Sequence, residues 1–324
     1  MAYMRLQLLG FHFHRLSFTS FLTLFPFRLV GLTASYRSPA KHLSYWYRPH
    51  TSTTRLPILF IHGIGIGLYP YIDFLSDINS PTSGEEDDGK VGVLAVEIMP
   101  ISFRITHSVL DKDELCMELR QIVAKHGYDR FVLVSHSYGS VISKFILADE
   151  VLRPKAASAL FVDPVNFLLH TPDVAHNFTV RQPRRANEWQ LWYFASKDPG
   201  VAHALGRRFF WSQKVMWNKD VDDLIHGGKR LTVSLAGKDL IVNCEAVKRY
   251  LINSGTNQAG GYDDYKDEES LSLSSEENSW KPKEWSGNGM EVLCFEQLDH
   301  GQVFDKSATR ARLIRAVREY CEDG

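Results

Sequence analysis

Three residues of the sequence have the chemistry of a nucleophile, an acid and a base, in the order Ser137, Asp239 and His300. A serine hydroxyl is a weak nucleophile at neutral pH, so it needs a base to remove its proton. Histidine titrates near neutrality and can accept that proton and then return it to a leaving group. A buried carboxylate fixes the histidine tautomer and stabilises the imidazolium. Together they predict attack on a carbonyl through an acyl-enzyme, because each residue supplies what the next one needs.

Ser137 lies at the apex of a predicted turn between a strand and a helix. Residues 131–134 are apolar, and residues 141–147 have the spacing of an amphipathic helix. The turn needs small residues two positions before and after its apex, and these are Ser135 and Gly139. The usual pattern is G-x-S-x-G, so Ser135 stands where a glycine is expected. Such a turn presents the serine hydroxyl at the end of a sheet, beside the positive end of the next helix.

Asp239 and His300 also follow predicted strands, at residues 231–236 and 291–295. In an open parallel sheet these strand ends lie along one edge, where ligands bind. Asp163 follows another predicted strand and is the alternative acid, although it also suits a turn or the start of a helix. We favour Asp239, because it ends a Gly-Lys-Asp segment directly after the next strand.

A glycine-rich segment follows an early predicted strand at residues 57–61. It reads His62-Gly63-Ile64-Gly65, and its glycines allow the backbone to approach a bound acyl group. Backbone N–H groups in this loop and at Tyr138 are candidates for stabilising the oxyanion of a tetrahedral intermediate. The loop donor is Gly63 or Ile64, and the sequence does not choose between them.

Composition excludes some partners and cofactors. The chain has 324 residues and a formal net charge of −1, without a basic stripe, so we expect no nucleic acid as partner. Its histidines lack the spacing of metal ligands, and its four cysteines lack metal or disulfide spacing. We therefore expect no metal site.

The order of predicted elements indicates an α/β fold. Strands and helices alternate through most of residues 36–324, which predicts one domain with a mostly parallel central sheet and helices on both faces. Residues 164–228 break this alternation and are rich in aromatic side chains, so we expect a helical cap inserted over the sheet. Residues 253–289 are rich in serine, glycine and acidic residues, and we expect a disordered acidic loop.

Residues 1–35 form an apolar N-terminal segment. Its Phe- and Leu-rich part is interrupted by Pro26 and Arg28, so the uninterrupted run is short for a bilayer. The alternatives are a membrane-surface segment, a signal peptide and a helix packed on the domain. We favour membrane association, which leaves cytoplasmic and secreted locations open.

These features resemble the α/β-hydrolase superfamily over roughly residues 40–324, and more narrowly a group of fungal hydrolase-like proteins. The likeness to the superfamily rests on four segments, residues 58–65, 134–140, 237–239 and 299–301. The likeness to the fungal proteins rests on three more, residues 45–49, 97–100 and 187–191. The resemblance implies hydrolysis of an ester or lipid without a metal or organic cofactor. Fungal relatives of this kind often carry an apolar N-terminal region, which agrees with membrane association.

The function we expect is that of a serine hydrolase cleaving a small-molecule carboxylic ester or lipid. Two other possibilities remain open at this point. The fold can serve as a non-catalytic binding or membrane-scaffold module, or the same site can carry out acyl transfer or a lyase reaction.

Overall fold

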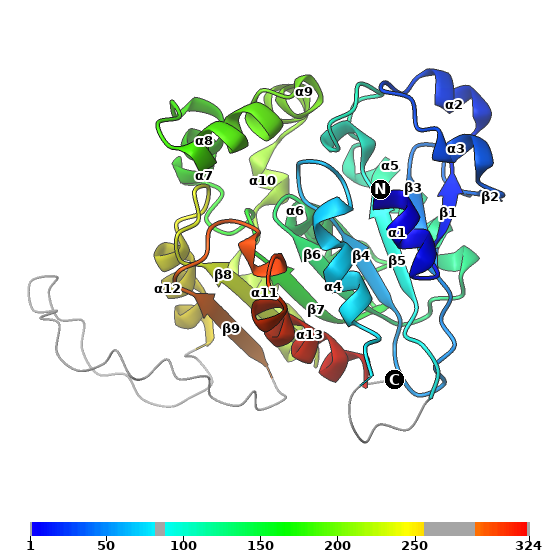
Figure 1. Ribbon diagram of the computed structural model, residues 1–324. Helices are drawn as coiled ribbons and strands as arrows, with labels where there is room; N and C mark the ends of the chain where they lie inside the picture. Colours follow the sequence, from blue (N-terminus) through cyan, green and yellow to red (C-terminus); the bar gives the residue numbers. More distant parts are fainter. Residues whose placement is uncertain (1, 82–87, 256–288, 323–324) are drawn as a thin grey trace, which may run out of the picture.

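The computed structural model describes residues 2–81, 88–255 and 289–322, which form one nine-stranded sheet flanked by helices (Figure 1). The strand order is β2-β1-β3-β5-β4-β6-β7-β8-β9. Neighbours from β5 to β9 are parallel, whereas β3 is antiparallel to both β1 and β5. The predicted mostly parallel sheet is therefore confirmed. The strands are β1 (His12–Arg15), β2 (Tyr36–Arg37), β3 (Ser44–Arg48), β4 (Ile58–Ile61), β5 (Val93–Glu97), β6 (Phe131–His136), β7 (Ala156–Val162), β8 (Arg230–Ala236) and β9 (Met290–Phe295).

Helices cover both faces of the sheet, as the alternation of elements predicted. Side chains alternate between faces along a strand, so Leu59 and Ile61 of β4 join one buried cluster while Ile58 and Phe60 join the other. Strands buried on both faces are mainly apolar, which explains the long apolar runs in the sequence. The first face packs against α5 (Lys112–Lys125), α6 (Gly139–Leu147), α11 (Asn218–His226) and α12 (Cys244–Gly255); the second packs against α1 (Ala2–Leu8), α4 (Ile72–Asp77) and α13 (Ser307–Cys321).

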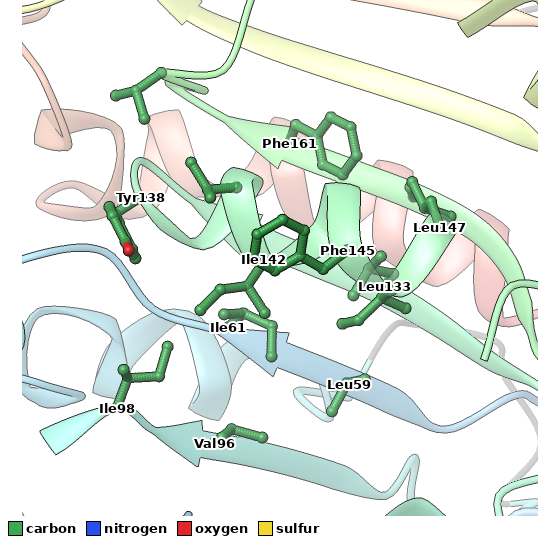
Figure 2. Close-up of a cluster of buried hydrophobic side chains, with 14 of the residues drawn as sticks. Leu59, Ile61, Val96, Ile98, Leu133, Tyr138, Ile142, Phe145, Leu147 and Phe161 are labelled. Atoms are coloured by element: carbon green, nitrogen blue, oxygen red, sulfur yellow. The ribbon is translucent and has the colours of Figure 1, made fainter. Parts of the chain in front are cut away.

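Helix α6 is anchored in the first of these clusters. Figure 2 shows Ile142 and Phe145 of α6 directed toward Ile61 of β4 and Leu133 of β6. Ile142 and Phe145 are three positions apart, so they lie on one side of the helix. This packing fixes the start of α6, and with it the position of Ser137, two residues before the helix.

The N-terminal segment is part of the same folded unit. Strand β1 pairs with β3 and β2, so the boundary that we drew at residue 36 does not separate two structures. Arg28, which interrupts the apolar run, forms a buried ion pair with Glu97 at an Nη1–Oε2 distance of 2.7 Å. The sequence predicts no strand here, because β1 is short and has no continuous apolar run. Helices α2 (Phe18–Leu22) and α3 (Val30–Thr33) complete the segment.

No helix among the described residues is both long enough and apolar enough to cross a membrane. Association of the N-terminal segment with a membrane surface is a separate matter and stays a prediction.

Residues 164–228, which we call the cap, connect β7 to β8 and contain short helices. Figure 1 shows α7, α8 and α9 above the end of the sheet. Of the predicted acidic loop at residues 253–289, the first three residues complete α12 and residues 256–288 lie outside the described part of the chain. The α-helices of the cap are α7 (Asp173–Ala175), α8 (Ala186–Leu191), α9 (Pro199–Arg207), α10 (Trp211–Lys214) and α11, the last of which packs against the sheet.

Candidate active site

Ser137 occupies a strained turn between β6 and α6. Its φ is 52°, a left-handed conformation that a residue with a Cβ rarely adopts. Its N–H donates to the Val162 carbonyl at 2.9 Å, and its own carbonyl accepts from the Ser140 N–H at 2.9 Å and the Ser140 hydroxyl at 2.7 Å. Such strain costs about 1–3 kcal/mol and persists only where the surroundings enforce it, typically at functional sites. The turn therefore has the geometry of a nucleophile elbow.

The two small residues around the apex have different roles. A Cβ on Gly139 would lie 2.5 Å from the Ile61 carbonyl oxygen, so the close approach of α6 to β4 requires glycine. Ser135, in place of the expected glycine, is fully buried in β6 and pairs with Ile61 and Phe161 on the neighbouring strands. The space restriction thus lies on the helix side of the elbow, and the strand side accommodates a serine.

Ser137, His300 and Asp239 are brought together by the sheet edge. Ser137 Oγ lies 2.8 Å from His300 Nε2, and His300 Nδ1 donates to Asp239 Oδ2 at 2.7 Å. The second oxygen of Asp239 accepts from the backbone N–H groups of Ile241 and Val242, at 2.7 and 3.0 Å. Backbone N–H groups therefore fix one oxygen of Asp239 while the other orients His300.

The alternative acid, Asp163, has a different position. Its Oδ2 accepts from the Gly301 backbone N–H at 2.8 Å, next to His300 rather than on its ring. Like Ser137, it has a left-handed backbone, with a φ of 43°. Asp239 is thus the carboxylate on the histidine ring, and Asp163 is a second carboxyl group beside it.

Burial and neighbouring charges have opposing effects on the pKa values of His300 and Asp163. Burial by itself would lower the pKa of His300, but the carboxylate of Asp239, supported by Asp163 and Asp299, raises it to about 9. Burial raises the pKa of Asp163 to about 7, although the nearby His300 opposes this shift. The imidazolium of His300 is therefore stabilised, which favours proton transfer from the serine hydroxyl.

The structure distinguishes the two candidate donors of the glycine-rich loop. The Gly63 N–H donates to the Tyr71 hydroxyl at 3.1 Å and is therefore occupied. Within the described part of the chain, the N–H groups of Ile64 and Tyr138 have no acceptor. Both residues line the same cavity as Ser137. The N–H groups of Ile64 and Tyr138 are thus the ones available at the cavity, whereas Tyr71 accepts that of Gly63; the role of the loop as an oxyanion donor stays a prediction.

Gly63 has a steric role instead. A Cβ at this position would lie 2.8 Å from Ser137 Cβ and 2.9 Å from His136 Nδ1. Only glycine allows the loop to pass this close to the nucleophile.

A cavity of about 720 Å³ opens at Ser137, between the end of the sheet and the cap. Its walls are mainly apolar and come mostly from the cap. Cavities of this volume are typical of small-molecule sites. Apolar residues that line it include Val165, Leu169, Phe178, Leu205, Phe209 and Ile241.

Asp163, Asp239 and His300 also present ligand atoms within 4.8 Å of one another, a spacing suitable for a metal ion. The hydrogen bonds to Ser137 Oγ and to the Gly301 N–H account for this cluster through protein partners. The arrangement therefore fits a Ser-His-Asp triad.

Two residues that shape the site have no signal in the sequence. Tyr71 holds the Gly63 N–H, and Ser140 braces the strained carbonyl of Ser137. Tyr71 directly precedes α4 and Ser140 lies in the first turn of α6, where a single polar residue gives no signal of such a contact. Only the spatial approach of separate loops assigns these roles.

No family model and no curated protein matches the sequence. Among solved structures, a bacterial membrane phospholipase A described as a virulence factor superposes with a TM-score of 0.58 at 11% identity, covering 99% of this chain and 90% of that one. Carboxylesterases of the thaumarchaeon Nitrososphaera gargenis give 0.54 at 13% identity, with 89% and 98% covered. The 2-hydroxy-6-oxo-6-phenylhexa-2,4-dienoate hydrolase of Rhodococcus sp. strain RHA1 gives 0.51 at 10% identity, with 85% and 94% covered. At such identities the likeness concerns the fold.

Proposed function

The chain has the α/β-hydrolase fold, and we propose that it is a serine hydrolase that cleaves a carboxylic ester with an apolar acyl group. One observation carries this proposal. Ser137 Oγ and His300 Nε2 are 2.8 Å apart, and His300 Nδ1 donates to Asp239, at the floor of a mainly apolar cavity. A nucleophile, its base and an orienting acid are what acyl transfer to a serine requires.

The reaction begins when Ser137 Oγ attacks the ester carbonyl and His300 Nε2 accepts the hydroxyl proton. The oxygen of the carbonyl becomes an oxyanion, which the N–H groups of Ile64 and Tyr138 stabilise. A single such donor contributes about 3–4 kcal/mol to lowering the barrier. His300 then gives its proton to the leaving alcohol, and the acyl group remains on Ser137.

Water completes the cycle by the same route. His300 removes a proton from a water molecule that attacks the acyl-enzyme carbonyl. His300 then returns this proton to Ser137 Oγ as the bond between Oγ and the acyl group breaks and the acid is released. Asp239 keeps the ring in the orientation that these proton transfers need.

The walls of the cavity support an apolar acyl group. Leu169 and Phe178 of the cap are buried and face the same cavity as the nucleophile. Transfer of apolar surface out of water contributes roughly 25 cal/mol per Å². Longer acyl chains should therefore bind more tightly until the cavity is filled.

A fluorophosphonate probe tests the nucleophile directly. Wild-type protein should be labelled, and Ser137→Ala should not. Ser143→Ala is a matched control, because Ser143 is a buried serine of α6 whose hydroxyl has no partner among the described residues. Failure to label the folded wild-type protein would refute the proposal.

A panel of p-nitrophenyl esters of graded chain length then defines the reaction. We expect release of free acid, with a preference for apolar acyl groups. Ester product in the presence of an added alcohol, without free acid, would instead indicate acyl transfer.

We also propose that the N-terminal segment contacts a membrane surface. Figure 1 shows α2 and α3 at the same end of the sheet as the cap. Phe25 pairs with Ile105, and Phe103 contacts Phe194 of the cap at a ring distance of 6.1 Å, so the exposed apolar side chains of the two regions are connected. The exposed apolar residues of the segment include Phe18, Leu22, Phe25, Phe27, Leu29 and Leu32.

Flotation with phosphatidylcholine vesicles tests this contact. The double variant Leu22→Ser/Leu29→Ser should float less than wild type. Met117→Ser/Val151→Ser is the matched control, because it also removes two exposed apolar side chains, but from helix α5 and from the turn after α6. Equal flotation of both variants would contradict a role for the N-terminal segment.

A further inference from the structure

A row of buried polar side chains lies beneath the triad. The Tyr71 hydroxyl accepts from the Gly63 N–H at 3.1 Å and lies 2.7 Å from His136 Nδ1. His136 Nε2 faces Asp163 Oδ2 at 3.9 Å, too far for a hydrogen bond, and has no hydrogen-bond partner among the described residues. Asp163 Oδ2 accepts from the Gly301 N–H. The side chains of Tyr71, His136 and Asp163 are all buried, at 3, 6 and 1% exposure. Buried polar groups of this kind are costly unless they are paired, so their alignment calls for an explanation.

The hydrogen atoms of this row can be assigned from the donors. The Tyr71 oxygen accepts the Gly63 N–H, so its own hydrogen needs another acceptor, and His136 Nδ1 is within reach. His136 must then carry its proton on Nε2, the nitrogen nearer to Asp163. Burial and the neighbouring His300 and His62 lower the pKa of His136 well below its usual value, so the ring is neutral. Hydrogen-bond donation therefore runs from Gly63 through Tyr71 to His136, and the His136 Nε2–H faces the Asp163 carboxyl group across 3.9 Å.

Both ends of the row stand one residue away from a group that acts on the substrate. Gly63 precedes Ile64, whose N–H is an oxyanion donor. Gly301 follows His300, the base. The middle of the row, His136, directly precedes the nucleophile.

Backbone conformation supports the same arrangement. Asp163 keeps a φ of 43°, although it is not glycine, and its N–H is held by the Ser234 carbonyl at 2.8 Å. Gly301 has a φ of 76°, and a Cβ there would lie 3.4 Å from the His136 ring. The histidine loop is thus folded directly onto His136.

We propose that Tyr71, His136 and Asp163 are positioning residues, which hold the oxyanion loop at Gly63 and the histidine loop at Gly301 in register with the nucleophile. This inference rests on the serine hydrolase function proposed above. Its physical basis is the steep dependence of such reactions on geometry, since a displacement of about 1 Å can cost roughly 100-fold in rate. The loops at Gly63 and Gly301 are far apart in the sequence, so the chain connectivity alone does not fix their relative position.

Tyr71→Phe tests the oxyanion end. The ring packs against Phe60 and Phe304, and phenylalanine keeps that packing while it removes the hydroxyl. We expect kcat for p-nitrophenyl butyrate to fall roughly 10- to 100-fold, with KM within about twofold of wild type. The rate of fluorophosphonate labelling should fall by a similar factor. Tyr128→Phe is the matched control, because Tyr128 is a buried tyrosine whose hydroxyl has no partner among the described residues.

Asp163→Asn and Asp163→Ala test the histidine end. The amide oxygen of asparagine can still accept from the Gly301 N–H, whereas alanine offers no acceptor. We expect Asp163→Ala to lose roughly 10- to 100-fold in kcat and Asp163→Asn to recover a measurable part of that loss. Circular dichroism and thermal melting establish that each compared variant is folded.

The outcomes separate this inference from the function on which it rests. Absence of labelling at Ser137 in folded wild type would refute the serine hydrolase itself. Labelling of wild type together with an unchanged rate in Tyr71→Phe, or with equal loss in Asp163→Asn and Asp163→Ala, would overturn the positioning role alone. A loss in Tyr71→Phe no larger than in Tyr128→Phe would also overturn it.

Discussion

Replacing Asp239 by asparagine should reverse the tautomer of the base. The Oδ1 atom of Asp239 accepts two backbone N–H groups, from Ile241 and Val242. In Asp239→Asn the amide oxygen must remain at those donors, because an NH₂ group there would leave them unpaired. The NH₂ group then faces His300 Nδ1, which must become an acceptor. His300 Nε2 consequently carries the proton and cannot accept one from Ser137.

The magnitude follows from the loss of the base. A wrong tautomer in an otherwise intact triad lowers kcat by roughly 10⁴-fold, a value known from a serine protease. That factor corresponds to about 5 kcal/mol in the activation free energy. Hydrolysis of p-nitrophenyl butyrate and the fluorophosphonate labelling rate measure it. Melting should change little, since the substitution preserves shape.

Asp163→Asn is the informative comparison, because it changes a buried carboxyl group that is next to the same histidine but not on its ring. It should be much less impaired than Asp239→Asn. If Asp239→Asn kept activity within tenfold of wild type while Asp163→Asn lost 10⁴-fold, the assignment of the orienting acid would be wrong.

Three further predictions concern pH and stability. Only neutral His300 can accept a proton. Burial would lower its pKa, but Asp239 raises it to about 9, so the rate of fluorophosphonate labelling should increase with pH from neutrality toward 9. A labelling rate that is flat across this range would contradict the shift. Gly139→Ala should destabilise the protein by about 1–3 kcal/mol in urea titrations, because the added Cβ meets a carbonyl of β4 at 2.5 Å; an unchanged midpoint would show that the elbow can relax. Arg28→Ala should cost about 3–5 kcal/mol in the same assay, because it leaves Glu97 buried without its cation, and an effect under 1 kcal/mol would mean that water reaches Glu97.

Local sequence patterns predict most of the fold. Buried parallel strands need mainly apolar residues on both faces, so the strands from β4 to β9 are recognisable as mostly apolar runs, several of them followed by polar residues. Because those polar residues share one sheet edge, Ser137, Asp239 and His300 could be selected together from three distant segments.

The N-terminal strands escaped the same reasoning. Strand β1 has four residues and alternates histidine with phenylalanine and arginine, so its period is too short to identify. Its place in the sheet depends on pairing with β3, and the burial of Arg28 depends on Glu97 at the end of β5. Neither partner can be inferred from the segment itself.

The sequence by itself thus determined an α/β fold and a serine, an acid and a histidine at strand ends. The tertiary structure decided which of two acids reaches the histidine ring, and that Ile64 rather than Gly63 has the available loop N–H. The physical reason is that strand ends bring several polar groups within a few ångströms of one another, while hydrogen-bond partners depend on the path of each loop. The elbow at Ser137 was visible from local pattern, but the contacts of Tyr71, His136 and Asp163 exist only because separate loops converge beneath it.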